Sequence, residues 1–160
     1  MLQFRAGVVK ALTSTHLPPP AAGEVRVHHT AIGFNYIDVY QRSGVYPLQF
    51  PSPLGFEAAG VVAAVGPGVT SPAPGERVAY AVAGLGAYAD ARNVAADRLV
   101  PLPDAITDEQ GAQLIAMPFS AVMLLEFLEV KSGDWVAQNT ANGAVGKSLA
   151  MLARARGVHV

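Results

Sequence analysis

The sequence contains no cysteine. This absence excludes disulfide bonds, zinc sites built on thiolates and enzymes that use a cysteine nucleophile. It also agrees with a protein that works in a reducing compartment.

Charge is scarce as well, since only 14% of the residues are Asp, Glu, Lys or Arg and the formal net charge is −1. With 11 basic and 12 acidic side chains, the chain has no basic field that would hold a nucleic acid or an anionic membrane. We therefore expect neither of these partners. A small, largely neutral molecule fits this composition better.

Long apolar runs are also missing. The longest, AAGVVAAV and VAYAVAGLGAYA, are far shorter than the ~20 residues of a membrane-spanning helix and contain glycine. The first residues, MLQFRAGVVKALTSTHLPPP, lack the basic stretch followed by a long apolar run that marks a signal peptide. These patterns predict a soluble cytoplasmic protein.

Hydrophobic residues, in contrast, make up 51% of the 160 residues and can bury a substantial core. Up to about residue 105, short runs rich in Val, Ala and Tyr are separated by Pro and Gly, which predicts a compact, mostly β domain. In EVRVHHTAIG, the alternation predicts Val25, Val27 and His29 on one side of a strand. The stretch YIDVYQRSG predicts a short helix, with Asn35 and Asp38 a turn apart near its start.

After residue 105 the pattern becomes helical. Thr107 and Gln110 form a capping-box signature before an apolar run, and Pro118 should divide this run into two helical pieces. VKSGDWVAQNT predicts a turn and a buried strand, GKSLAMLARARG a helix that stops at Gly157, and VHV the start of another strand. The order of strand, glycine turn, helix and strand is typical of a parallel crossover unit.

The glycine turn lies in the segment ANGAVG. Gly143 and Gly146 occupy the second and third glycine positions of the dinucleotide-binding pattern G-x-G-x-x-G, and Ala141 replaces the first. Such a turn lets a pyrophosphate approach the N-terminal end of a helix, although small residues there also serve plain packing. The residue that reads the ribose would lie ~20 positions further on, so these residues leave both NADPH and NADH open.

Several ordered stretches together resemble one known family. They are NYIDVYQRSGVYP, GFEAAGVVAAVGPGV, PGERV and SGDWVAQNTANGAVG, and they resemble the zinc-free quinone oxidoreductase (zeta-crystallin-like) branch of the medium-chain dehydrogenase/reductase superfamily. The resemblance implies a mostly β GroES-like domain over residues 1–120, followed by the beginning of an α/β Rossmann nucleotide-binding domain over residues 121–160. It also implies that the chain is truncated, since family members are about twice as long.

The same alignment bears on metal chemistry. Where the zinc alcohol dehydrogenases of this superfamily hold their catalytic ion with a Cys and a His, this sequence has Asn35 and Phe56. Without thiolates or converging imidazoles, a tetrahedral zinc site is not expected. Glu57 is expected to remain as a buried structural carboxylate.

The resemblance also nominates site residues. Asn35, Tyr40 and Tyr46 are the candidate catalytic residues, because an Asn amide or a Tyr hydroxyl can donate to an acceptor oxygen that gains negative charge. A helix cap for Asn35 and half-buried packing for the two tyrosines are the alternative roles. Ala144 replaces a glycine of the family pattern and should fit only if its φ is negative. The candidate NADPH-binding residues are Tyr36, Ile37, Asp38, Val39, Tyr40, Ser120, Asn142, Gly143, Ala144, Val145 and Gly146.

Three functions stay open. The first is an NADPH-dependent quinone oxidoreductase that passes hydride to a quinone or another conjugated carbonyl without zinc. The second is a 2-enoyl thioester reductase of the same superfamily, favoured by QNTANGAVG, in which Tyr46 would donate a proton. The third, favoured by the length of the chain, is a non-catalytic fragment or binding domain. For the full-length protein the resemblance also implies a homodimer.

Overall fold

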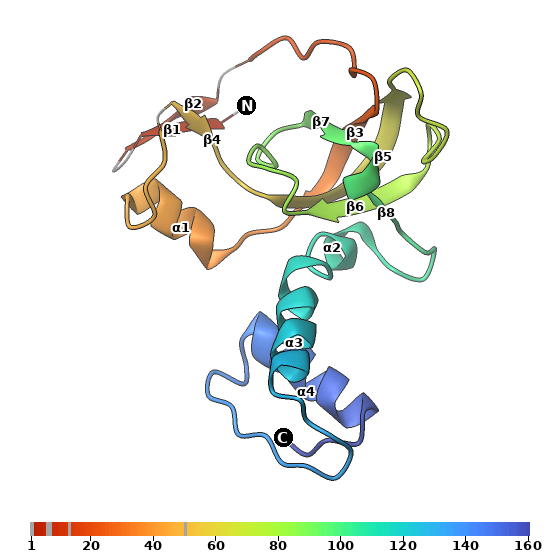
Figure 1. The fold of residues 1–160 in the computed structure, drawn as a ribbon. Helices are drawn as coiled ribbons and strands as arrows, with labels where there is room; N and C mark the ends of the chain where they lie inside the picture. Colours follow the sequence, from red (N-terminus) through yellow and green to blue (C-terminus); the bar gives the residue numbers. More distant parts are fainter. Residues whose placement is uncertain (1, 6–7, 13, 50) are drawn as a thin grey trace. The chain divides into compact units, whose positions relative to one another are not determined.

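The computed structural model describes residues 2–5, 8–12, 14–49 and 51–160 (Figure 1). The chain forms two compact units, Met1–Gln113 and Leu114–Val160, which we call the first unit and the second unit. The predicted domain boundary after residue 120 falls within a helix of the second unit, and the assignment of the two family domains stays a prediction.

The first unit is built mainly from strands, as its short runs rich in Val and Ala predict. Three short helical segments accompany the strands: α1 (Tyr36–Ser43), the 3₁₀ helix η1 (Ala96–Arg98) and α2 (Asp108–Gly111). The strands are β1 (Leu2–Arg5), β2 (Val8–Leu12), β3 (Glu24–Ile32), β4 (Ser52–Pro53), β5 (Glu57–Val65), β6 (Arg77–Ala81), β7 (Ala91–Ala95) and β8 (Val100–Pro101).

These strands form two antiparallel sheets, one in the order β2-β1-β4 and one in the order β7-β3-β5-β6-β8 (Figure 1). The two longest strands, β3 and β5, pair with each other inside the larger sheet. Val25 and Val27 are completely buried, which confirms the alternation predicted for β3, and they pack with Val62 and Val78. The larger sheet therefore has its hydrophobic core on this face.

The helix signals in the first unit are also confirmed. Helix α1 occupies the predicted stretch and ends at Gly44, whose φ of +82° is a left-handed conformation that favours glycine. At α2, the hydroxyl oxygen of Thr107 accepts from the backbone N–H of Gln110 at 3.2 Å. The side-chain oxygen of Gln110 accepts in return from the backbone N–H of Thr107 at 3.0 Å, which completes the predicted capping box.

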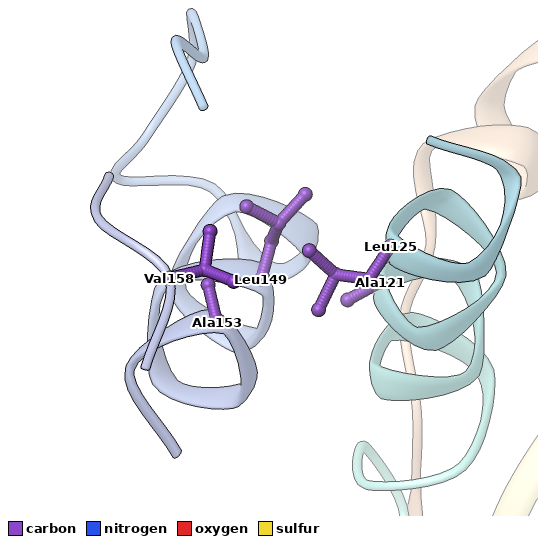
Figure 2. Packing of buried hydrophobic residues seen from close by; sticks show 5 residues of the cluster. All are labelled: Ala121, Leu125, Leu149, Ala153 and Val158. Carbon is purple, nitrogen blue, oxygen red and sulfur yellow. The ribbon is translucent and has the colours of Figure 1, made fainter. Parts of the chain in front are cut away.

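The second unit contains helices α3 (Ala116–Phe127) and α4 (Ala144–Ala155). Pro118 lies in the first turn of α3, where its missing N–H has no helical acceptor to lose, so the apolar run is divided as predicted. Helix α4 is followed by Gly157 with a φ of +71°, the predicted stop. Figure 2 shows how the two helices pack through a small apolar cluster of Ala121, Leu125, Leu149, Ala153 and Val158.

The predicted strands of the second unit are much shorter than expected. Trp135 and His159 form a single parallel bridge. The segment VKSGDWVAQNT, which the structure describes in full, contains no strand beyond this bridge. Trp135 is also 78% exposed, so the prediction of a buried strand there is wrong. A parallel strand is buried only when neighbours cover both of its faces, and one bridge does not supply this cover.

The longest helices that the structure describes, α3 and α4, have 12 residues each. No helix in these described ranges is long and apolar enough to cross a membrane.

Candidate active site

The candidate site of the first unit lies where β3 ends and β5 begins. Ile32 pairs with Ala58 there, and this register brings the residues after β3 next to the start of β5. Asn35, at the N-cap of α1, donates from its side-chain Nδ2 to Oε1 of Glu57 at 2.6 Å. Both side chains are buried, with 7% of Asn35 and 2% of Glu57 exposed. The expectation of a buried Glu57 is confirmed, and the structure adds Asn35 as its partner.

Glycines make room for this arrangement. Asn35 ends the stretch GFN and Glu57 ends the stretch GFE, so each residue follows a glycine by two positions. A Cβ on Gly33 would lie 2.4 Å from Cγ of Glu57, and one on Gly55 would lie 2.4 Å from Cδ1 of Tyr88. Close-packed interiors do not tolerate such approaches.

Asp38 fixes the backbone at the start of α1. Its Oδ2 accepts from the backbone N–H of Asn35 at 2.9 Å and from the hydroxyl of Tyr88 at 2.8 Å. Burial, and then the hydrogen bond to the Asp38 carboxylate, raise the pKa of Tyr88 well above its usual value of 10.0. Tyr88 therefore stays protonated, and it acts as a donor throughout the neutral range. Tyr88 was not among the predicted residues.

Three tyrosines gather along α1 and the segment after it. The rings of Tyr36 and Tyr40 have centroids 5.1 Å apart in an edge-to-face arrangement, and those of Tyr40 and Tyr46 are 5.4 Å apart. Tyr36 is 66% exposed, Tyr40 37% and Tyr46 50%. The other predicted residues of this helix, Ile37 and Val39, are half-buried. Helix α1 and the segment after it thus carry partly exposed tyrosines, and the buried Asn35 amide stands at the N-cap of the same helix.

The glycine turn of the second unit has the backbone that the sequence requires. Gly143 is the N-cap of α4 with a φ of −70°, and Ala144 is the first residue of the helix. Among the described non-glycine residues, a positive φ occurs at Val82, Glu129 and Thr140, so Ala144 meets the condition set for it. A Cβ on Gly146 would lie 2.7 Å from the carbonyl oxygen of Thr140. The glycine at position 146 is therefore required by close backbone approach.

A cavity of about 580 Å³ adjoins this turn. It is lined by residues 137–140 before the turn, by the first turn of α4, and by Met117 and Leu124 of α3. Asn142 lies exposed in the turn. Ser120 is half-buried on α3 and donates to the carbonyl oxygen of Ala116 at 3.0 Å. Met117 was missed, because a methionine in a helix gives no sign of whether it lines a cavity.

The predicted site residues thus form two groups, one in each unit. Asn35, Asp38 and the three tyrosines belong to the first unit, and Ser120 and the glycine turn belong to the second. Asn35 is engaged with Glu57 in the structure, and Phe56 precedes Glu57 as a half-buried side chain. Within the part of the chain that the structure describes, no group of three or more His, Asp or Glu side chains could hold a metal ion.

The family model of the alcohol dehydrogenase GroES-like domain matches residues 21–104, which is more than half of the chain. The chain therefore belongs to the alcohol dehydrogenase GroES-like family. Within it, the similarities described next place the chain in the quinone oxidoreductase branch of the medium-chain dehydrogenases/reductases. The predicted fold class, a mostly β GroES-like domain followed by the beginning of an α/β nucleotide-binding domain, is confirmed.

The quinone oxidoreductase of Pseudomonas aeruginosa is 43% identical over 143 residues, which are 88% of this chain and 44% of that protein. Quinone oxidoreductase 1 of Escherichia coli is 42% identical over 140 residues, 86% of this chain and 43% of that protein. The crystal structure of the Escherichia coli quinone oxidoreductase complexed with NADPH matches 98% of this chain and 50% of that chain, with a TM-score of 0.91 and 39% identity. The chain thus spans about half the length of these relatives.

Proposed function

We propose that this chain serves an NADPH-dependent quinone oxidoreductase, which transfers hydride from NADPH to a quinone without zinc. The observation that carries the proposal is the match over 98% of the chain to a quinone oxidoreductase solved with NADPH. The NADPH would supply the hydride from its nicotinamide ring. The residues of this chain would bind the two molecules, orient them and stabilise the charge that develops on the acceptor.

The glycine turn fits the pyrophosphate of such a cofactor. The first N–H groups of α4, from Ala144, Val145 and Gly146, have no acceptor within the helix, and the helix dipole favours an anion at this end. Because the carbonyl oxygen of Thr140 lies so close to position 146, this position requires glycine, and the first turn of the helix carries no side chain there. Backbone groups would therefore do most of the pyrophosphate binding, with Asn142 and the hydroxyl of Ser120 as further contacts.

The first unit supplies the groups for the acceptor. The quinone oxygens gain negative charge as hydride arrives, and uncharged donors stabilise this charge without a cost for burying an ion. Tyr40 and Tyr46 are partly exposed and carry hydroxyls that suit this role, and Tyr36 adds an aromatic face beside them. Asn35 would act from its buried position through the second Nδ2 hydrogen, since Glu57 and the capping box engage the other polar atoms of its carboxamide. Ile37, Asp38 and Val39 complete the helical segment proposed to lie near the nicotinamide.

Three further properties belong to the same proposal. Asn35 and Phe56 stand at the positions of the zinc ligands in related alcohol dehydrogenases, and this supports chemistry that needs no zinc. A homodimer of the full-length protein and a cytoplasmic location are also proposed.

A second candidate is the reduction of a 2-enoyl thioester. The mitochondrial enoyl-[acyl-carrier-protein] reductase of Caenorhabditis elegans is 34% identical over 153 residues, 94% of this chain and 44% of that protein. The hydroxyl of Tyr46, a residue that is 50% exposed, would then donate a proton to carbon while hydride adds to the other end of the double bond. The higher identity to quinone oxidoreductases favours the first candidate.

The experiment follows NADPH oxidation by the natural gene product that contains these 160 residues, with duroquinone and crotonyl-CoA as competing acceptors. We expect a higher kcat/KM for duroquinone, and a higher value for crotonyl-CoA would select the second candidate. The 160-residue chain is measured alongside. Steady turnover by this chain alone would contradict the third function left open above, a non-catalytic fragment or binding domain.

A further inference from the structure

Asn35 is held at two separate points in the first unit. Glu57 accepts from its carboxamide at 2.6 Å, and Asp38 accepts from its backbone N–H at 2.9 Å. Asp38 is held in turn by the hydroxyl of Tyr88 at 2.8 Å. Both carboxylates are almost completely buried, with 2% of Glu57 and 3% of Asp38 exposed. The contact with Asp38 is that of a capping box, whereas the contact with Glu57 is not part of one.

The chemistry of the first contact is directional. A carboxylate accepts hydrogen bonds, whereas a carboxamide has a donor end at Nδ2 and an acceptor end at Oδ1. Glu57 therefore favours the amide orientation in which Nδ2 of Asn35, and not Oδ1, faces the carboxylate. One Nδ2 hydrogen is bound to Glu57, the Asn35 side chain faces the backbone N–H of Asp38 in a capping box, and the second Nδ2 hydrogen is left for another partner. Without the carboxylate, only the capping box would hold the amide in this orientation.

We propose that Glu57 is a positioning residue that fixes the orientation of the Asn35 carboxamide for the acceptor, while Asp38 and Tyr88 fix its backbone. The inference rests on the proposed function, because it needs Asn35 to contact a substrate. The packing around the Glu57 side chain supports the inference. Gly33 leaves room for the Glu57 side chain, and Glu57 is the one charged residue in the otherwise apolar and glycine-containing β5. Burying a carboxylate is costly, so its contacts have to compensate.

A spectroscopic test can be made on the 160-residue chain without any cofactor. In the wild type, one side-chain amide proton of Asn35 should be shifted downfield and protected from exchange by the short bond to Glu57. Glu57→Gln removes the negative acceptor and nearly conserves the shape, so this shifted signal should disappear while the backbone spectrum is conserved. A signal that persists in Glu57→Gln would overturn the inference, whether or not the protein reduces quinones.

A kinetic test uses the natural gene product with NADPH and duroquinone. Loss of the fixed amide should lower kcat/KM for duroquinone by about ten- to a hundred-fold, with the KM for NADPH changed by less than about two-fold. In an Asn35→Ala background the same Glu57→Gln change should have little further effect, since Glu57 acts through Asn35. Equal losses in both backgrounds would show a role in the fold alone and would overturn the inference.

Two more variants keep the result decisive. Glu57→Asp retains the buried charge and withdraws the carboxylate by one methylene, so it should also lose the shifted amide signal and the quinone activity. Asp108→Asn is the matched control, because Asp108 is a carboxylate of the same unit whose hydrogen bonds go to Arg77 and Thr30. It should leave kcat/KM for duroquinone unchanged. If the wild type reduces no quinone, the proposed function fails, and the amide signal still decides the positioning.

Discussion

A Cβ on Gly33 would lie 2.4 Å from Cγ of Glu57, so the two residues share a space in which one more methyl group does not fit. The carbonyl oxygen of Ala112, 2.5 Å from the same position, closes this space from another side. The backbone N–H of Gly33 also donates to the carbonyl oxygen of Glu57 at 3.1 Å, which prevents the two segments from moving apart. The stability of the first unit should therefore be sensitive to this glycine.

Gly33→Ala should destabilise the chain by about 3 kcal/mol, because overpacking a closed site forces the backbone to shift. Urea unfolding followed by circular dichroism measures this loss. In the double variant Gly33→Ala/Glu57→Ala, the contact with Glu57 is removed and the contact with Ala112 remains. The double variant should thus be more stable than the sum of the two single losses predicts, and strict additivity would argue against a steric conflict between the two residues.

Gly146→Ala should disturb the turn before α4, since its Cβ would lie 2.7 Å from the carbonyl oxygen of Thr140 and 2.8 Å from Cα of Ala141. We expect a loss of stability of about 1–3 kcal/mol and at least about ten-fold weaker NADPH binding. Gly143→Ala is the matched control for stability. Its Cβ would lie 3.2 Å from the same carbonyl oxygen and its φ is −70°, so we expect a loss below about 1 kcal/mol. Equal losses would show that the turn does not require close approach at position 146.

Tyr88→Phe should cost about 1–3 kcal/mol, because the buried Asp38 carboxylate loses a donor. The raised pKa of Tyr88 gives a second readout. Since the folded-state pKa lies above the unfolded value of 10.0, this contribution to stability is complete below pH 10 and is lost as the pH rises further. In a spectrophotometric titration of the folded chain, Tyr88 and Tyr80 should ionise above the usual value of 10.0, since burial raises the pKa of both. The Tyr88→Phe variant should retain the ionisation of Tyr80 above this value.

The pH dependence near neutrality should come from His29. Its ring bonds to the carbonyl oxygen of Ala89 at 2.7 Å and to the hydroxyl of Tyr80 at 3.0 Å, and burial lowers its pKa below 6.5. The unfolded chain therefore takes up a proton more readily than the folded chain. Stability is complete above pH 6.5 and falls as the pH drops towards the folded-state pKa.

Unfolding free energies at several pH values between 5 and 8 test this expectation. His28→Gln is the matched control, since His28 is the exposed neighbour of His29 on β3. The His28→Gln variant should keep the loss of stability at low pH, and His29→Gln should weaken it. A pH dependence that survives unchanged in His29→Gln would assign it to another group.

The elements that the sequence predicted are those with local causes. The alternation of Val25 and Val27, the capping box of Thr107 and Gln110, and the stop at Gly157 each depend on residues a few positions apart. The structure confirms all of these. The glycine turn could also be recognised, because its requirements are set by the backbone of a few successive residues.

The missed features depend on residues far apart in the chain. Tyr88 reaches Asp38 across 50 positions, and Asn35 reaches Glu57 across 22, so no local pattern predicts either contact. The expected buried strand at Trp135 was wrong for a related reason. Burial of a strand depends on what packs beside it, and the apolar character of the segment itself does not determine this. The catalytic and cofactor roles of the site residues stay predictions.

The division of the chain into two units also separates its chromophores. All five tyrosines lie in the first unit, at positions 36, 40, 46, 80 and 88, and the single tryptophan, Trp135, lies in the second. Trp135 stacks on His159 with ring centroids 4.5 Å apart, so its emission reports on the parallel bridge directly. Tryptophan fluorescence and tyrosine absorbance of one unmodified sample therefore follow the melting of the two units separately.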